Sequence, residues 1–190
     1  FTYRDFDDQK RREELLQIAI DCWAEVAEHG KAAGLSYVFW EPMSIGREFG
    51  ETIAACMKLQ DRLTAANMAV PMWMMADIDH GDVTSPNPDD TDPDAWARAV
   101  PKVSPIIHIK QSTMNKGGHW PFTAQHNENG RITPQTLIAA VRAGGGTDNV
   151  VPEVNTGSNL RSMVSVSWDK NSRSEADRSE GLDYQIGAPV

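Results

Sequence analysis

The sequence predicts an α/β fold in which buried strands alternate with amphipathic helices around a parallel sheet. Short apolar runs with strand character occur at residues 35–40, 69–79, 104–111 and 148–154. Segments with helical spacing or helix-start signals occur at residues 8–29, 52–66, 92–100 and 133–145. Because parallel strands need a crossover, usually a helix, this alternation favours βαβ units.

The helix boundaries follow from local signals. Asp92 with Pro93, and Thr133 with Pro134, are typical of an N-cap followed by the first helical position. Gly30 is expected to end the first helix. Its core-facing side is predicted from apolar residues spaced three and four apart, namely Leu15, Ile18, Ala19, Cys22, Trp23 and Val26. A long polar loop is expected after His108, before the helix at Thr133.

Composition limits the classes of function. The 190 residues are 40% hydrophobic and 24% charged, as in ordinary globular domains, and the net charge is −9. An acidic chain disfavours a nucleic-acid surface, since binding phosphates needs a basic face. Two cysteines without a CxxC motif favour a reducing cytoplasm, and no apolar run approaches the ~20 residues of a membrane span.

Ionisable residues stand at the ends of the predicted strands. Glu41, Asp77, His108 and Glu153 follow or close the four runs in order. Chemistry in parallel α/β folds lies at the carboxyl ends of the strands. Three carboxylates and one imidazole suit a divalent ion such as Mn²⁺, Co²⁺ or Mg²⁺ better than structural zinc. Taken singly, each residue has a structural alternative, as a helix cap, a surface acid, a core histidine or a turn.

The motifs around these residues carry a resemblance. "WEPMS", "DIDH", "HIKQ" and "HWPFT" resemble the sugar and sugar-phosphate epimerases of the xylose-isomerase-like TIM-barrel group, closest to the branch that epimerises erythrulose 1-phosphate at C3. The likeness covers roughly residues 10–154. It implies a (β/α)₈ barrel of which this chain carries the C-terminal half, about four βα units, in residues 1–154. Residues 155–190 form a tail of uncertain structure.

The resemblance also implies roles for individual residues. Glu41, Asp77, His108 and Glu153 would bind one divalent metal ion, and Glu41 and Glu153 would also move protons. His80 takes the position that contacts a substrate hydroxyl, while Asp79 stands where the family usually has Gly. Further substrate-binding candidates are Arg47, Lys110 and Lys116 for a phosphate, and His119 and Trp120 for the pocket. The three cations have an equal alternative as solvated loop charges.

The function expected from the resemblance is metal-dependent epimerisation of a ketose or ketose phosphate at C3, through an enediolate. A ketose–aldose isomerase would use the same acids and metal. A barrel half with a structural role is the non-enzyme alternative. A metal-dependent AP endonuclease shares the barrel, but the net charge of −9 disfavours it. The expected partner is a small sugar or sugar phosphate, without nucleic acid or membrane, and a homodimer is the candidate assembly.

Overall fold

The computed structural model describes residues 2–43, 45, 48–81, 84–113, 116–120, 122–146 and 163–166, with the side chains of 116–119 and 163–166 excluded. The helices are α1 (Tyr3–Asp7), α2 (Gln9–Ala32), α3 (Ile53–Ala65), the 3₁₀ helix η1 (Pro88–Thr91), α4 (Pro93–Ala99), α5 (Ala124–Asn127) and α6 (Pro134–Ala143). The strands are β1 (Val38–Trp40), β2 (Met72–Asp77), β3 (Ile106–Ile109), β4 (Gln111–Thr113), β5 (Lys116–Trp120) and β6 (Met163–Val166).

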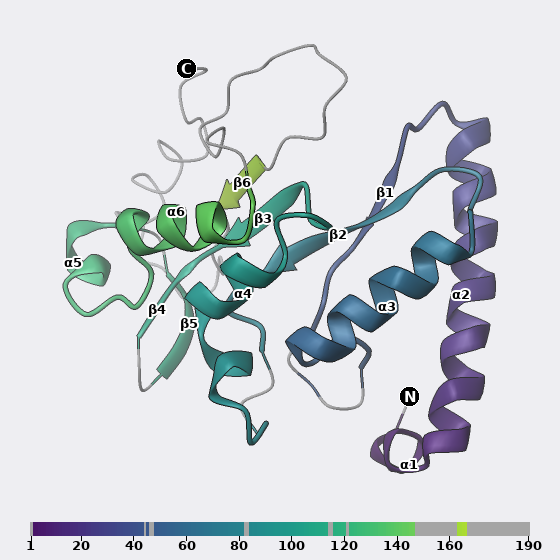
Figure 1. Cartoon of the computed structure of the whole chain (residues 1–190), viewed down its shortest axis with the longest axis horizontal. Coiled ribbons are helices and arrows are strands. Elements are labelled where there is room, and N and C mark those ends of the chain that lie inside the picture. Colours follow the sequence, from purple (N-terminus) through teal and green to yellow (C-terminus); the bar gives the residue numbers. More distant parts are fainter. Residues whose placement is uncertain are drawn as a thin grey trace. The chain divides into compact units, whose positions relative to one another are not determined.

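Four strands form one sheet in the order β1-β2-β3-β6 (Figure 1). The β1–β2 and β3–β6 pairs are both parallel, with Trp40 opposite Met74 and His108 opposite Ser165. Helices connect consecutive strands of this sheet. The predicted α/β class with a parallel sheet is therefore confirmed.

The chain divides into two compact units, and β2 contributes to both. The first unit holds residues 1–75 and 80–91, and the second holds residues 76–79 and 92–190. The boundary falls inside β2, after Met75. Residues at the end of β2 therefore belong to the same unit as β3.

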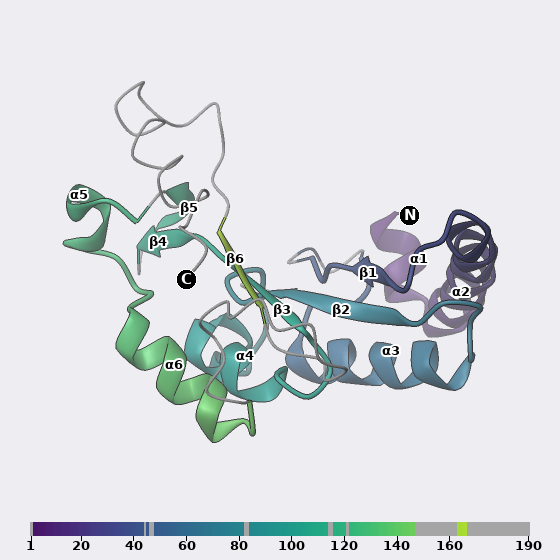
Figure 2. The ribbon, with the colours of Figure 1, turned by 90° about the horizontal axis from the view of Figure 1, so that it is seen from above.

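In the first unit, α3 runs along one face of β2 (Figure 2). Gln60, which is 1% exposed, joins the two elements because its Nε2 donates to the Met72 carbonyl over 3.0 Å. Its Oε1 accepts a 2.8 Å bond from Trp40 Nε1, so the same side chain also holds β1. Cys56 Sγ lies 3.4 Å from Met74 Sδ. The helix predicted over 52–66 forms over Ile53–Ala65, and its N-cap is Thr52.

Helix α2 buries a different face from the predicted one. Its buried residues are Leu16, Ile20, Ala27 and Gly30. Ile18 and Val26, predicted to face the core, are 53% and 49% exposed, and Cys22 is exposed as well. The buried residues and the predicted apolar residues therefore form two stripes along α2, offset by about one position in the sequence. Tertiary packing, and not the 3.6-residue period, decides which of them is covered.

Gly30 does not end the first helix, contrary to expectation. It is buried inside α2, and a Cβ there would meet Leu35, Val38 and Val70 at 3.5–3.7 Å. The helix continues to Ala32, and Gly34 then takes a φ of +83° that favours glycine. Leu35 and Tyr37 precede strand β1, which begins at Val38. The predicted strand therefore starts three residues too early.

In the second unit, α4 and α6 lie side by side on one face of β3 and β6 (Figures 1 and 2). Both helices begin as predicted, at Asp92–Pro93 and Thr133–Pro134. Ser104 Oγ accepts from the Ala76 amide over 2.9 Å and donates to the Ile106 carbonyl over 2.6 Å. This hydroxyl ties the end of β2 to the start of β3.

The predicted polar loop after His108 is wrong in part, because it contains the antiparallel hairpin β4–β5. Gln111, which is 1% exposed, supports this segment: its Oε1 accepts from the Ile132 amide and its Nε2 donates to the Ile132 carbonyl and to Asn127 Oδ1. The strand predicted at 148–154 lies outside the described residues. The parallel partner of β3 is β6, in the region expected to be a tail.

Within the described ranges, no helix combines the length and the apolar character that a membrane crossing requires.

Candidate metal centre

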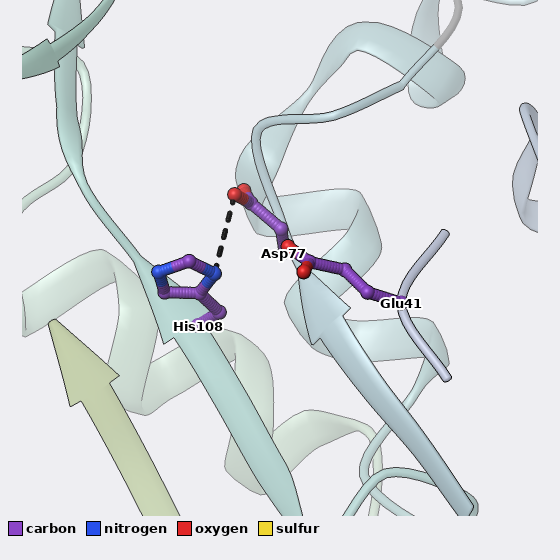
Figure 3. A group of neighbouring side chains, drawn as sticks. All are labelled: Glu41, Asp77 and His108. Carbon is purple, nitrogen blue, oxygen red and sulfur yellow. Dashed lines mark ion pairs between the residues drawn. The ribbon is translucent and has the colours of Figure 1, made fainter. Parts of the chain in front are cut away.

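Asp77 and His108 come from neighbouring strand ends in the second unit. Asp77 closes β2, and His108 lies near the end of β3. The Ile78 amide donates to the His108 carbonyl over 3.4 Å, which holds the two backbones together. His108 Nδ1 lies 3.5 Å from Asp77 Oδ2, and Figure 3 marks this pair. The two residues predicted as metal ligands therefore face one another.

The Asp77 carboxylate is fully buried and held on both oxygens. Its Oδ1 accepts a 3.0 Å bond from the Asp79 amide, as in an Asx turn. Its Oδ2 accepts a 2.6 Å bond from Lys110 Nζ, and the Lys110 side chain is 2% exposed. Lys110 was predicted as a loop cation for a phosphate. Its ammonium instead lies beside a carboxylate in the interior of the second unit.

Glu41 follows β1 directly in the first unit. His80, the last residue of the D-x-x-H motif, places Nδ1 3.7 Å from Glu41 Oε1. Both side chains are partly exposed. Glu41 also lines an open cavity of about 570 Å³ whose other walls are mostly apolar, including Trp23, Phe39 and Met72.

Glu41, Asp77 and His108 make up a group of side chains that could hold a metal ion (Figure 3). Each residue offers one ligand atom, giving two carboxylate oxygens and one imidazole nitrogen. This donor set has no thiolate, and it suits Mn²⁺, Co²⁺ or Mg²⁺. The predicted fourth ligand, Glu153, lies outside the described residues.

Sequence reasoning missed an ion pair beside these residues. Arg131 Nη1 lies 3.3 Å from Asp79 Oδ1, and the two side chains are 19% and 7% exposed. The Arg131 amide donates to the Ser112 carbonyl, and Gln111 holds the neighbouring Ile132. Asp79 stands where the family usually has Gly, and this departure was the one indication of a special role for that position. Nothing in the sequence indicates that Arg131 is its partner.

The remaining predicted substrate residues are only partly described. Trp120 stacks on His126, with ring centroids 5.1 Å apart and an interplanar angle of 21°. Arg47 lies outside the described residues, as do the side chains of Lys116 and His119. Their proposed contacts with substrate stay predictions.

Comparison with solved structures defines the class of fold. The chain superposes with a TM-score of 0.70 on the crystal structure of a protein from Rhodospirillum rubrum ATCC 11170 described as a candidate xylose isomerase. The match covers 99% of this chain and 58% of that protein, at 22% identity. At this identity the likeness shows the fold alone. The chain thus has an α/β fold that matches part of a xylose-isomerase-like TIM barrel.

Comparison of sequences is more specific. The chain is 78% identical over 151 residues to D-erythrulose 1-phosphate 3-epimerase of Brucella abortus (strain 2308). This alignment covers 80% of this chain and 49% of the relative, so the chain spans about half the length of that protein. No family model matches the chain. The resemblance predicted from the sequence motifs is confirmed.

Proposed function

We propose that this chain carries the metal-binding and proton-transferring residues of a sugar-phosphate 3-epimerase acting on erythrulose 1-phosphate or a close analogue. The 78% identity to D-erythrulose 1-phosphate 3-epimerase is the observation that carries this proposal. The facing pair of Asp77 and His108, 3.5 Å apart at neighbouring strand ends, supports it. We further propose that residues 1–154 correspond to the C-terminal half of the barrel, to which β6 adds a strand beside β3.

In the proposed site, Glu41, Asp77, His108 and Glu153 hold one divalent ion. When bound, the ion acts as a Lewis acid on the ketone and offsets the negative charge of the enediolate. The buried Asp77 carboxylate and the His108 imidazole supply ligands from adjacent strands. Their fixed positions reduce the reorganisation needed when charge develops in the transition state.

Proton transfer is assigned to the two glutamates. One carboxylate removes the C3 proton, and the electron pair of the C3–H bond forms the C2–C3 double bond of the enediolate. The carboxylic acid on the opposite face of C3 then donates its proton, which inverts the configuration. General base and acid groups on opposite faces are needed because a single base would return the proton to the same side. We assign these roles to Glu41 and Glu153, and we assign His80, 3.7 Å from Glu41, to a substrate hydroxyl.

The test is proton exchange measured by NMR in D₂O, with the protein, Mn²⁺ and erythrulose 1-phosphate. Protein-dependent deuterium at C3 is the expected result. Glu41→Gln should abolish this exchange, while Glu28→Gln, the same change on the exposed side of α2, should leave it unchanged. Deuterium at C1 or C2 with formation of an aldose would show an isomerase instead. No exchange with ketose phosphates, despite bound Mn²⁺, would refute the proposal.

A further inference from the structure

Lys110 and Asp77 form a buried ion pair to which the proposed chemistry assigns no role. Lys110 Nζ donates to Asp77 Oδ2 over 2.6 Å, and the two side chains are 2% and 0% exposed. A lysine is rarely buried to this degree unless its ammonium has a partner. The Asp77 carboxylate is such a partner, and it accounts for the burial of the Lys110 ammonium. The pairing also means that the position of the Asp77 carboxylate depends on Lys110.

The strand places this lysine beside the metal ligands by alternation. Lys110 directly follows β3, two residues after His108, and both side chains lie on the side of the sheet where they reach Asp77 Oδ2. Ile107 and Ile109, which are 0% and 9% exposed, point to the other side and enter the core. One short strand segment therefore supplies a ligand nitrogen and a cation to the same carboxylate.

The Asp77 carboxylate accepts a hydrogen bond on each of its oxygens. The Asp79 amide bonds to Oδ1 over 3.0 Å, and Lys110 bonds to Oδ2 over 2.6 Å. Hydrogen bonds to both oxygens fix the carboxylate plane about its χ2 torsion. The orientation in which the carboxylate meets a metal ion is then set before the ion binds. Partners of this kind orient metal ligands in many sites, and their loss commonly costs about 10- to 100-fold in metal affinity or activity.

We infer that Lys110 is a positioning residue that presets the Asp77 carboxylate for the divalent ion. The inference rests on the proposed function, since it requires Asp77 to be a metal ligand. It assigns Lys110 to the carboxylate and not to a substrate phosphate. A purely electrostatic role would act with the opposite sign, because an ammonium beside the site repels a cation. The two roles therefore predict opposite changes in metal affinity when Lys110 is replaced.

The test compares Mn²⁺ affinities, measured from the electron paramagnetic resonance signal of free Mn²⁺ during titration. Lys110→Met should weaken Mn²⁺ binding by about 10- to 100-fold. Lys110→Gln should lose less, because its amide keeps an N–H donor but is one atom shorter. Lys58→Met, at a side chain that is 73% exposed, is the matched control and should bind as the wild type does. The visible absorption of bound Co²⁺ should also change in the Lys110 variants, because ligand geometry determines that spectrum.

The outcomes distinguish a failure of the positioning role of Lys110 from a failure of the proposed metal site. A wild-type protein that binds no Mn²⁺ would overturn both. Wild-type binding with equal or tighter affinity in the Lys110 variants would overturn the inference alone. If Lys110→Met does not fold, as judged by circular dichroism, Lys110→Gln carries the same test. Unchanged affinity and an unchanged Co²⁺ spectrum in that variant would then refute the positioning role.

Discussion

Replacing Gln60 by leucine should destabilise the first unit, because one buried amide joins three elements. Gln60 on α3 accepts from Trp40 Nε1 of β1 over 2.8 Å and donates to the Met72 carbonyl of β2 over 3.0 Å. Leucine has similar volume but no polar atoms. The variant therefore leaves a buried indole N–H and a buried carbonyl to be satisfied by other means.

The expected cost follows from these two groups. A buried polar group left without a partner costs about 1–3 kcal/mol. Two such groups would cost about 2–6 kcal/mol, and the added apolar burial of leucine offsets roughly 1–2 kcal/mol of this. We therefore expect the free energy of unfolding to fall by about 1–4 kcal/mol.

The assay is urea denaturation followed by far-UV circular dichroism and tryptophan fluorescence. Gln135→Leu, the same change at an exposed position of α6, is the matched control and should alter stability by less than about 0.5 kcal/mol. The indole N–H resonance of Trp40 should move in Gln60→Leu and stay in place in the control. Equal midpoints for the two variants, with an unmoved indole resonance, would refute the reasoning.

Three further outcomes are expected. Gly130→Ala should destabilise the second unit by about 1–3 kcal/mol, because a Cβ there would clash with the Gln111 side-chain amide, and Gln111→Ala should relieve most of that added cost in a double-mutant cycle. In the native protein, iodoacetamide should label the exposed Cys22 and not Cys56 until urea is added, because burial raises the pKa of the Cys56 thiol; equal native rates would contradict this. Asp92→Ala should cost about 1 kcal/mol in thermal or urea unfolding by removing the α4 N-cap, and an unchanged midpoint would show that the cap is dispensable.

Helix starts could be predicted from the sequence because their signals are local. Asp92 and Thr133, each followed by proline, cap helices at the predicted starts, and each accepts a bond from an amide two or three residues ahead. Such a bond needs no information from elsewhere in the chain. The positions of Asp77 and His108 near strand ends were also predictable, because Asp77 closes one short apolar run and His108 lies within the next.

Features that depend on distant partners could not be predicted. Which apolar stripe α2 buries depends on what packs against it, and both stripes have helical spacing. The bond from Lys110 to Asp77 joins residues 33 positions apart, and a charged residue after a strand usually indicates a solvated loop. Gly30 resembles a helix stop until Leu35 and Val70 are seen to pack against it. In each case the deciding contact is long-range.

Because β2 contributes residues to both compact units, the chain cannot be divided into two fragments that each contain one whole unit. Residues up to Met75 belong to the first unit, residues 76–79 to the second, and residues 80–91 to the first again. No single cut separates the two cores. A cut before β2 deprives the first unit of residues 72–75 and 80–91, and a cut after β2 separates Asp77 from the second unit. Fragment expression would therefore yield two incomplete pieces and no autonomous domain, so point substitutions are the better means of assigning function to either part.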